Sequence, residues 1–356
     1  MPAPRRILVV KLATLGDVLT MTPALRALRV SFPQTHIGVL TTPAGAPALR
    51  GLDSFDEIVT FDKYAFDRPR DVWRGVPLGI RFAGQLRAGR WDTLVLLHHL
   101  TTPFGIAKYA TLALLSGASR RVGLENGRGR WFLTDGAEDR GFGWRHEVDY
   151  ALDVVARLGA RYPGEPHLEL AIPDTCVARE NVALLVPGSG AFSRARRWAP
   201  ERFAAVGRQL AKAHGLEPRV LSGLDADEQR LAIDVAASIG REARVVPPAA
   251  SPQALGELVR RCRLVVANDG GVVHVATAVG TPVVAVFGPS NDRAWGPYPV
   301  GDPRHQVVRE QLACAPCIHR GHTFGTPQGC PARTCLALVE PAHVVAAAER
   351  ALGVPA

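Results

Sequence analysis

The sequence lacks long apolar runs, low-complexity tracts and internal repeats. No stretch reaches the roughly 20 apolar residues that a membrane-spanning helix requires. The apolar run after Arg5 and Arg6 is too short for the hydrophobic part of a signal peptide, and no cleavage site follows it. We therefore expect a globular cytoplasmic protein, with any membrane contact being peripheral.

Aromatic residues and lysines are also scarce. Phe, Trp and Tyr make up 6% of the 356 residues, and lysines are a small part of the 42 basic residues. The net charge of +9 indicates an anionic partner, whether nucleic acid, anionic lipid or a phosphorylated sugar. Binding of single-stranded nucleic acid needs aromatic side chains beside the basic ones, so the composition argues against nucleic acid. A GC-rich genome would explain part of the arginine excess.

The six cysteines do not form the even pattern of a secreted disulfide framework. Four of them lie in one Pro- and Gly-rich segment, residues 314–335: Cys314, Cys317, Cys330 and Cys335. Their C-x-x-C and C-x-x-x-x-C spacing is typical of a four-thiolate metal site, and such ligands suit zinc or iron. We therefore expect one structural metal ion. The alternatives are free buried thiols or disulfides, and a reducing cytosol disfavours disulfides. Cys176 and Cys262 are isolated and are expected to be packing residues.

Apolar runs and helical patterns alternate along the chain. Residues 7–11, 36–43 and 91–100 have the composition of buried strands, and 18–32 has the spacing of an amphipathic helix. The chain is too long for one simple core, and such alternation predicts doubly wound parallel sheets. The sequence therefore predicts an α/β protein with Rossmann-like domains.

A Pro-rich stretch, residues 161–180, separates two alternating halves. We expect domains at 1–170 and 171–356 that face a cleft, with ligand bound beside the carboxyl ends of their strands. The second domain carries the cysteine segment and a C-terminal helix at 341–352.

Residues 264–290 are the most informative segment. A strand pattern is broken by a D-G-G turn, and a helical pattern and a second strand pattern follow. Glycines let a ligand approach the backbone, and the free N–H groups at a helix start bind anions. Packing of an α/β unit is the alternative explanation. The residues that we expect to contact a ligand here are Asp269, Gly270, Gly271 and His274.

A second glycine-containing turn, P-G-S-G at 187–190, ends the first strand pattern of the second half. A basic run follows it and precedes another helical pattern. Arginine suits bidentate contact with phosphate, whereas a solvated basic loop is the alternative. The candidate phosphate contacts are Gly188, Ser189, Arg194, Arg196 and Arg197.

The first strand–helix connection runs from Lys11 through Gly16 to Asp17. It has no G-x-G-x-x-G pattern, which argues against a dinucleotide pyrophosphate loop. Asp17 stands where a helix N-cap belongs, and capping alone would explain its presence.

Together these segments resemble the ADP-heptose:lipopolysaccharide heptosyltransferase family, glycosyltransferase family 9, over nearly the whole chain. The order D-G-G-x-x-H-x-A-x-A-x-G-T-P followed by F-G-P, at 269–289, is similar to the family's nucleotide-sugar-binding signature. The resemblance implies the GT-B fold of two Rossmann-like domains. It also implies an inverting transferase that moves heptose from ADP-heptose to an anionic glycan, such as the lipopolysaccharide inner core, at the inner membrane and without a catalytic cofactor.

The resemblance implies roles for single residues as well. The family's K-x-x-x-x-G-D segment is matched by Lys11, Gly16 and Asp17, and its aspartate is thought to be the general base that deprotonates the acceptor hydroxyl. The resemblance makes Lys11 and Gly16 candidate donor contacts. Arg196 falls nearest the family's phosphate-binding lysine. An acidic residue of the family contacts the donor ribose, which makes Asp225 a candidate, although its place at a helix start favours capping.

The chain departs from the family pattern at several positions. Arginine replaces the usual lysine and Ala199 is inserted nearby, so either neighbouring arginine is an alternative phosphate ligand. His98 and His99 stand where the family more often carries Asp or Gln, which leaves the acceptor open. His146 matches a family histidine, for which a structural role is equally compatible. The cysteine segment is similar to the iron-binding cluster of some heptosyltransferases that modify autotransporter proteins.

Two other functions remain open at this stage. One is a GT-B enzyme of different specificity, such as a transferase that uses another nucleotide sugar or a protein acceptor, or a UDP-sugar epimerase. The other is a non-catalytic nucleic-acid-binding protein with a zinc knuckle, which would explain the charge but not the two glycine-rich turns or Asp17.

Overall fold

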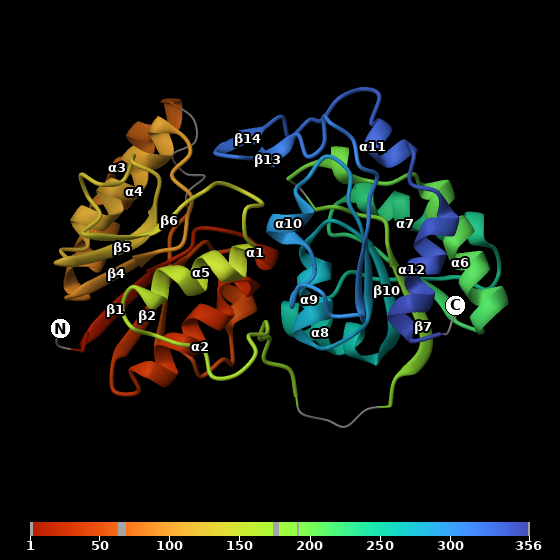
Figure 1. The fold of residues 1–356 in the computed structure, drawn as a ribbon, viewed down its shortest axis with the longest axis horizontal. Coiled ribbons are helices and arrows are strands. Elements are labelled where there is room, and N and C mark those ends of the chain that lie inside the picture. The colour runs from red at the N-terminus through yellow and green to blue at the C-terminus, as the bar shows by residue number, and fades with distance from the viewer. Residues whose placement is uncertain (1–2, 63–68, 174–177, 191, 355–356) are drawn as a thin grey trace. The chain divides into compact units, whose positions relative to one another are not determined.

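A computed structural model describes residues 3–62, 69–173, 178–190 and 192–354. Cys176, which we expected to be a packing residue, lies outside these ranges. The chain divides into two compact units, Met1–Gly141 with Glu147–Pro166 and Phe142–His146 with His167–Ala356. Each unit is built around its own six-stranded sheet (Figure 1).

The first unit alternates strands and helices as the apolar pattern predicted. Its elements are β1 (Arg6–Val10), α1 (Leu15–Leu19), α2 (Thr22–Ser31), β2 (His36–Thr41), β3 (Glu57–Thr60), α3 (Pro69–Ala88), β4 (Thr93–Leu96), α4 (Pro103–Leu115), β5 (Arg120–Glu125), β6 (Asp135–Glu138) and α5 (Glu147–Ala156).

The second unit repeats this alternation and ends in a further segment. Its elements are β7 (Glu180–Val186), α6 (Pro200–His214), β8 (Glu217–Leu221), α7 (Ala226–Ile239), β9 (Arg244–Val246), α8 (Pro252–Arg261), β10 (Cys262–Asn268), α9 (Gly271–Ala278), β11 (Val283–Val286), α10 (Asp292–Trp295), β12 (His305–Val308), β13 (Ile318–Arg320), β14 (Thr323–Gly325), α11 (Thr334–Ala337) and α12 (Pro341–Leu352).

Both sheets have the doubly wound strand order. The first runs β3-β2-β1-β4-β5-β6 and the second β12-β11-β10-β7-β8-β9, with parallel pairing throughout. The prediction of two Rossmann-like sheets is therefore confirmed. The winding reverses between β1 and β4 in the first sheet and between β7 and β10 in the second, and ligands of such sheets bind at the carboxyl ends beside that reversal.

Strand register brings the relevant connections to the same level of each sheet edge. Val10 of β1 pairs with Leu96 of β4, and Val186 of β7 pairs with Ala267 of β10. The residues that follow these strands therefore begin side by side within each unit. The two segments singled out in the second half, 187–190 and 269–271, flank one reversal point.

The sheets are buried on both faces, as parallel sheets require. In the first unit, α3 and α4 cover one face through Phe82, Leu86 and Leu112. α2 and α5, which contact each other, lie on the other face (Figure 1). In the second unit, α6, α7 and α12 contribute to one continuous core with the strands.

Within the described residues, no helix combines the length and apolar character that crossing a bilayer would require.

Candidate active site

The connection after β10 presents a carboxylate and the start of a helix. Asp269 is buried, and α9 begins at Gly271 with Gly270 as its N-cap. Arg196 Nη1 donates to Asp269 Oδ2 over 3.1 Å, and Arg196 Nη2 donates to the carbonyl oxygen of Ser189 over 2.6 Å. One guanidinium therefore joins the connections that follow β7 and β10.

The connection after β7 wraps around a buried carboxylate. Glu228 Oε1 accepts the backbone N–H groups of Ser189 and Gly190, each over 2.9 Å. A Cβ atom added at Gly188 would lie 2.9 Å from the Glu228 side chain, and one added at Gly223 would lie 2.0 Å from it. The absence of side chains at these two glycines is thus explained by the carboxylate that they enclose.

Glu228 belongs to a capping pattern at the start of α7. Asp225 is the N-cap, and its Oδ1 accepts the N–H group of Glu228 over 2.8 Å. The capping interpretation of Asp225 is confirmed. Sequence reasoning missed Glu228, although the D-x-x-E spacing is a capping-box signal that could have drawn attention to it.

The three arginines of the basic run have different partners. Arg196 is directed to Asp269, and its side chain is 12% exposed. Arg197 pairs with Asp227 and Glu228, and its hydrogen bond holds the pKa of the Asp227 carboxyl below its ordinary value. Arg194 is 69% exposed and reaches Asp227 over 3.4 Å. Of the three, Arg196 is therefore the best placed to contact a ligand at the strand ends.

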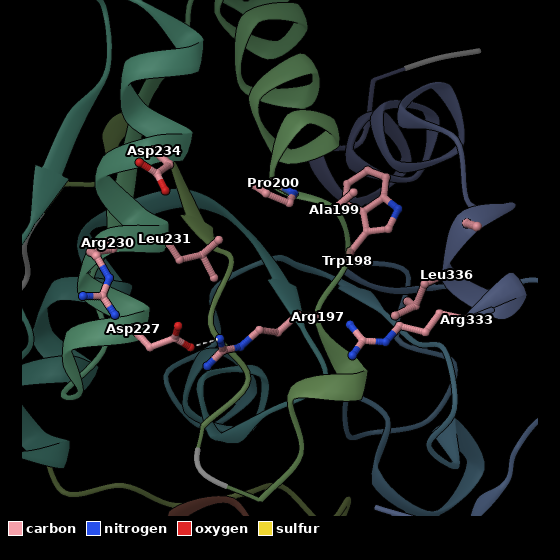
Figure 2. A pocket seen from close by; sticks show the side chains of 11 residues that line it. Arg197, Trp198, Ala199, Pro200, Asp227, Arg230, Leu231, Asp234, Arg333 and Leu336 are labelled. Atoms are coloured by element: carbon pink, nitrogen blue, oxygen red, sulfur yellow. Dashed lines mark hydrogen bonds and ion pairs between the residues drawn. The ribbon is translucent and has the colours of Figure 1, made fainter. Parts of the chain in front are cut away.

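A pocket of about 450 Å³ opens beside Arg197 (Figure 2). Its walls come from the start of α6, from α7 and from α11, and the labelled side chains are Arg197, Trp198, Ala199, Pro200, Asp227, Arg230, Leu231, Asp234, Arg333 and Leu336. Trp198 is fully buried, and its backbone N–H donates to Asn268 Oδ1 over 3.0 Å. Because Ser189 and Asp269 are not among the lining residues, this pocket adjoins the strand-end site without being part of it.

In the first unit, Asp17 lies in the first turn of a short helix. α1 begins at Leu15 with Thr14 as N-cap, so the interpretation of Asp17 as the N-cap is wrong. The helix starts earlier than the apolar spacing indicated, and Gly16 is buried within it. Burial and the charge of Asp17 raise the pKa of Tyr109, so this phenol and the carboxylate lie within electrostatic range.

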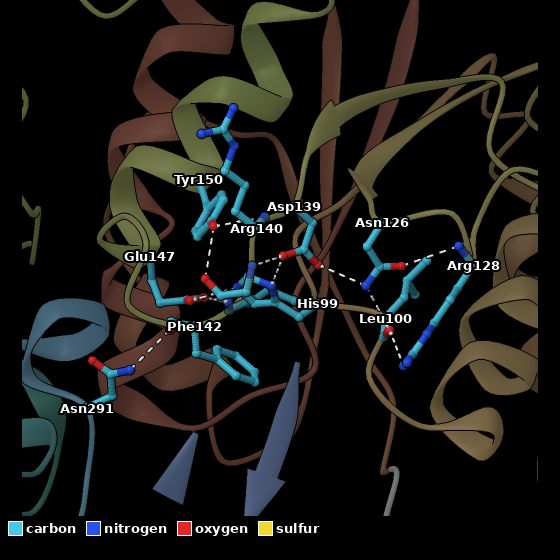
Figure 3. A network of polar contacts seen from close by, with 12 residues as sticks. His99, Leu100, Asn126, Arg128, Asp139, Arg140, Phe142, Glu147, Tyr150 and Asn291 are labelled. Carbon is cyan, nitrogen blue, oxygen red and sulfur yellow. Dashed lines mark hydrogen bonds and ion pairs between the residues drawn. The ribbon is translucent and has the colours of Figure 1, made fainter. Parts of the chain in front are cut away.

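A buried ionic network lies beside the same connection (Figure 3). His99 Nε2 lies 2.9 Å from Glu147 Oε1, and His99 Nδ1 lies 2.9 Å from Asp139 Oδ1. Lys11 Nζ lies 3.5 Å from Glu147 Oε2. Burial alone would lower the pKa of His99, but the charges and hydrogen bonds of Glu147 and Asp139 raise it to about 9.

The histidines that the sequence singled out elsewhere are buried within the second unit. His274 lies in α9. His146, in the short segment that belongs to the second unit, lies with its Nε2 3.0 Å from the carbonyl oxygen of Gly296, and its ring packs on Tyr298. The hydrogen bond and ring contact give His146 a structural role. A ligand contact for His274 remains a prediction.

The cysteine segment carries free thiols of unequal burial. Cys314 and Cys330 are exposed, whereas Cys335 is buried. Burial and the charges of the other thiols raise the pKa of Cys335 and of Cys317, so the four sulfur atoms lie within electrostatic range. Across the described ranges, no three His, Cys, Asp or Glu side chains are arranged to hold a metal ion. Cys262 is buried at the start of β10, which confirms its packing role.

Known proteins share this architecture and this sequence pattern. The family model of glycosyltransferase family 9 (heptosyltransferase) matches residues 80–327. The chain is 26% identical over 336 residues to lipopolysaccharide heptosyltransferase 1 of Pseudomonas aeruginosa, covering 90% of this chain and 88% of that protein.

Two solved structures have the same fold. The ADP-heptose lipopolysaccharide heptosyltransferase II of E. coli superposes with a TM-score of 0.71 at 19% identity, covering 98% of each chain. The E. coli heptosyltransferase WaaC, in complex with ADP-2-deoxy-2-fluoro heptose, superposes with a TM-score of 0.66 at 18% identity, covering 86% of this chain and 93% of WaaC. The resemblance and the GT-B fold predicted from the sequence are thus confirmed, and the chain belongs to glycosyltransferase family 9, the heptosyltransferases.

Proposed function

We propose that this glycosyltransferase moves a heptose from ADP-heptose to a glycan acceptor such as the lipopolysaccharide inner core, with inversion at the anomeric carbon. Its similarity to a lipopolysaccharide heptosyltransferase and the ADP-sugar ligand of WaaC support this donor and acceptor. We assign the donor mainly to domain 171–356 and the acceptor to domain 1–170. Such an acceptor would bring the protein into peripheral contact with the inner membrane from the cytoplasm.

The observation that carries the donor assignment is the position of Arg196. Its guanidinium spans the connections after β7 and β10, at the reversal point where doubly wound sheets bind ligands. The start of α9 adds backbone N–H groups that favour a diphosphate. Because Glu228 occupies the amides of Ser189 and Gly190, we assign the diphosphate chiefly to Arg196 and the N-terminus of α9.

In this proposal Asp17 is the general base. It accepts the proton of an acceptor hydroxyl while that oxygen forms a bond to the anomeric carbon. The bond from this carbon to the diphosphate oxygen breaks from the opposite face, and its electron pair leaves with ADP. Arg196 and the start of α9 stabilise the growing negative charge on the leaving group. One base and one displacement are sufficient for inversion.

A donor panel tests this function directly. The protein is incubated with a heptose-accepting core glycan and with ADP-heptose, ADP-glucose or a UDP-sugar, and ADP or UDP release is measured with and without acceptor. We expect acceptor-dependent release from ADP-heptose and an inverted product by NMR. Transfer from the UDP-sugar, without transfer from ADP-heptose, would contradict the assignment.

We also propose that the cysteine segment binds one structural zinc or iron ion. The C-x-x-C and C-x-x-x-x-C spacing of the four cysteines supports this proposal. Because no three of the thiols are arranged to hold a metal ion in this structure, binding requires a rearrangement of the cysteine side chains.

Elemental analysis of protein purified without an affinity metal tests this second proposal. We expect about one zinc or iron per chain, with metal content and melting temperature both lower in Cys314→Ser. Cys262→Ser removes a cysteine from outside the segment and should leave the metal content unchanged. A metal-free protein of full stability would refute the proposal.

A further inference from the structure

The connection that carries Asp17 is held by residues from two neighbouring strands. On one side, the backbone N–H of Lys11 donates to the carbonyl oxygen of Leu40, and Thr42 Oγ1 donates to that of Ala13 over 2.5 Å. On the other side lie the two consecutive histidines that follow β4. The family function as proposed above gives these histidines no role.

The side chain of His98 is hydrogen-bonded to the backbone of this connection. The N–H group of Leu12 donates to His98 Nε2 over 2.7 Å. The His98 ring stacks on Tyr109, with ring centroids 4.5 Å apart and an angle of 20° between the planes. Tyr109 in turn interacts with the charge of Asp17. Because Nε2 accepts a hydrogen bond, a neutral His98 carries its proton on Nδ1.

His99 holds the same connection through a chain of buried charges. Both of its ring nitrogens face carboxylate oxygens, and both can donate only when the ring carries two protons. The imidazolium fixes Glu147, whose second oxygen faces the ammonium group of Lys11. The side chains of His99, Glu147 and Lys11 are at most 8% exposed, so few alternative positions are open to them.

The network also has a defined place in the topology. Asp139 follows β6, Glu147 begins α5, and His99 follows β4, so one imidazolium ties three elements to Lys11, which directly follows β1. Asp139 Oδ1 additionally accepts the N–H of Gly141 over 2.8 Å (Figure 3). Buried ion pairs of this kind are costly to desolvate, so a purely structural role would be met as well by apolar packing.

We propose that His98 and His99 are positioning residues that hold the Lys11–Asp17 connection in its reactive conformation. His98 acts through the N–H of Leu12, and His99 acts through Glu147 and Lys11. This inference rests on the proposed function for its link to turnover, because it assumes that Asp17 is the base. The conformational part of the inference is independent of which substrate the enzyme uses.

Hydrogen exchange tests the conformational part without any substrate. The full chain is compared with His99→Gln, with His98→Phe, which keeps a ring on Tyr109, and with His36→Gln as the control. His36 begins β2 and pairs with Arg6 at the amino end of β1, whereas the Lys11–Asp17 connection follows the carboxyl end of β1. His36 Nε2 lies 2.7 Å from Glu57 Oε1. We expect faster exchange of the amides of residues 12–17 in the first two variants only. Unchanged exchange in both would overturn the proposal.

Turnover tests the link to Asp17. We expect His99→Gln and His98→Phe each to lower kcat by about 10²-fold, the usual effect of a small displacement of a reacting group, with unchanged affinity for ADP. His98→Gln restores an acceptor for Leu12 and should recover most of the loss. In an Asp17→Asn background neither histidine variant should reduce kcat further, since residues that act as a unit are not additive.

These experiments distinguish failure of the positioning role from failure of the proposed glycosyltransferase function. Additive losses in the Asp17→Asn background would show that the histidines act independently of Asp17, and would overturn the positioning role. Absence of turnover in the unmodified enzyme with every donor would refute the proposed function, whereas the exchange experiment would still decide whether the histidines order the connection. His98→Phe leaves the buried charges in place, so the test survives if His99→Gln does not fold.

Discussion

Asp17 sits in the first turn of α1, where the helix dipole favours a carboxylate. If Asp17 is the base, Asp17→Asn should lower turnover by about 10²–10⁴-fold, because the acceptor proton loses its receiving group. The affinity for the donor should not change, because we assign the donor-binding site to the second unit. Steady-state kinetics and calorimetric titration with ADP measure the two effects separately.

The same substitution also removes a charge from a helix start, which costs about 0.5 kcal/mol of stability. Glu201→Gln is the matched control, since Glu201 lies in the first turn of α6 and is exposed. Equal losses of activity in the two variants would reduce Asp17 to a structural role.

Arg196 and Arg194 provide a matched pair for the donor site. Arg196→Ala should weaken ADP binding by about 10–100-fold, the range expected when hydrogen bonds to a charged group are lost. Arg194→Ala removes the same charge from the same basic run, but its side chain is exposed and directed to Asp227, so affinity should change little. Calorimetric titration of both variants with ADP measures their affinities. Equal affinities would contradict the assignment of the diphosphate to Arg196.

The residues found by pattern and those that were missed differ in kind. Glycine turns, the basic run and Asp17 follow strand patterns directly, so their positions at strand ends were predictable. Asp139 and Glu147 have roles that depend on partners distant in the sequence, and one chain gives no signal for such pairing. Glu228 carries a local signal, the D-x-x-E capping spacing, but that spacing does not reveal its contact with the connection after β7. For the same reason, the sequence could not indicate that the amides after β7 are bound by a side chain.

At the scale of elements, the His99 network links β1, β4, β6 and α5 and makes their packing sensitive to pH. The pKa of His99 is about 9 in the folded chain, whereas the ordinary value of 6.5 applies in the unfolded chain. Below pH 6.5 both states are protonated and the stabilisation is complete. As pH rises toward 9, the unfolded chain loses the proton first, so the free energy of unfolding should fall by up to about 3 kcal/mol.

Urea unfolding at several pH values between 6 and 9.5 measures this dependence. In His99→Gln the contribution of this residue to the pH dependence disappears. The plot of unfolding free energy against pH should therefore be flatter over the same range. Equal slopes in the two proteins would show that His99 does not carry the extra proton in the folded state.

The elements that sequence analysis missed have weak apolar patterns. β6 (Asp135–Glu138) reads D-G-A-E and forms the edge of its sheet, where one strand neighbour and partial burial are sufficient. β12 is likewise an edge strand, and β13 and β14 form a separate two-stranded sheet. The helix expected at 18–32 is split into α1 and α2 around Met21. Central strands, buried on both faces, were predicted because burial fixes their composition.

At the scale of the whole molecule, the two units have the same strand order but different surroundings at their reversal points. In the first, buried pairs of opposite charge flank the connection with Asp17. In the second, Arg196 and the start of α9 lie at the carboxyl ends of β7 and β10. We base on this difference the proposal that the second unit binds the anionic nucleotide and the first supplies the proton acceptor.

Because the donor is assigned to one compact unit, ADP should stabilise that unit selectively. At 100 times Kd, ligand binding adds about 2.7 kcal/mol, which corresponds to an increase of roughly 5–10 °C in the melting temperature of a domain of this size. Differential scanning calorimetry should show this shift with ADP, smaller shifts with UDP and GDP, and none with a short oligonucleotide. At the same ADP concentration, Arg196→Ala should reduce the shift to about half or less. His99→Gln, which lies in the first unit, should lower the other transition without affecting the response to ADP. A larger shift with the oligonucleotide than with ADP would instead favour a nucleic-acid-binding protein, and loss of the ADP response in His99→Gln would contradict the placement of the donor in the second unit.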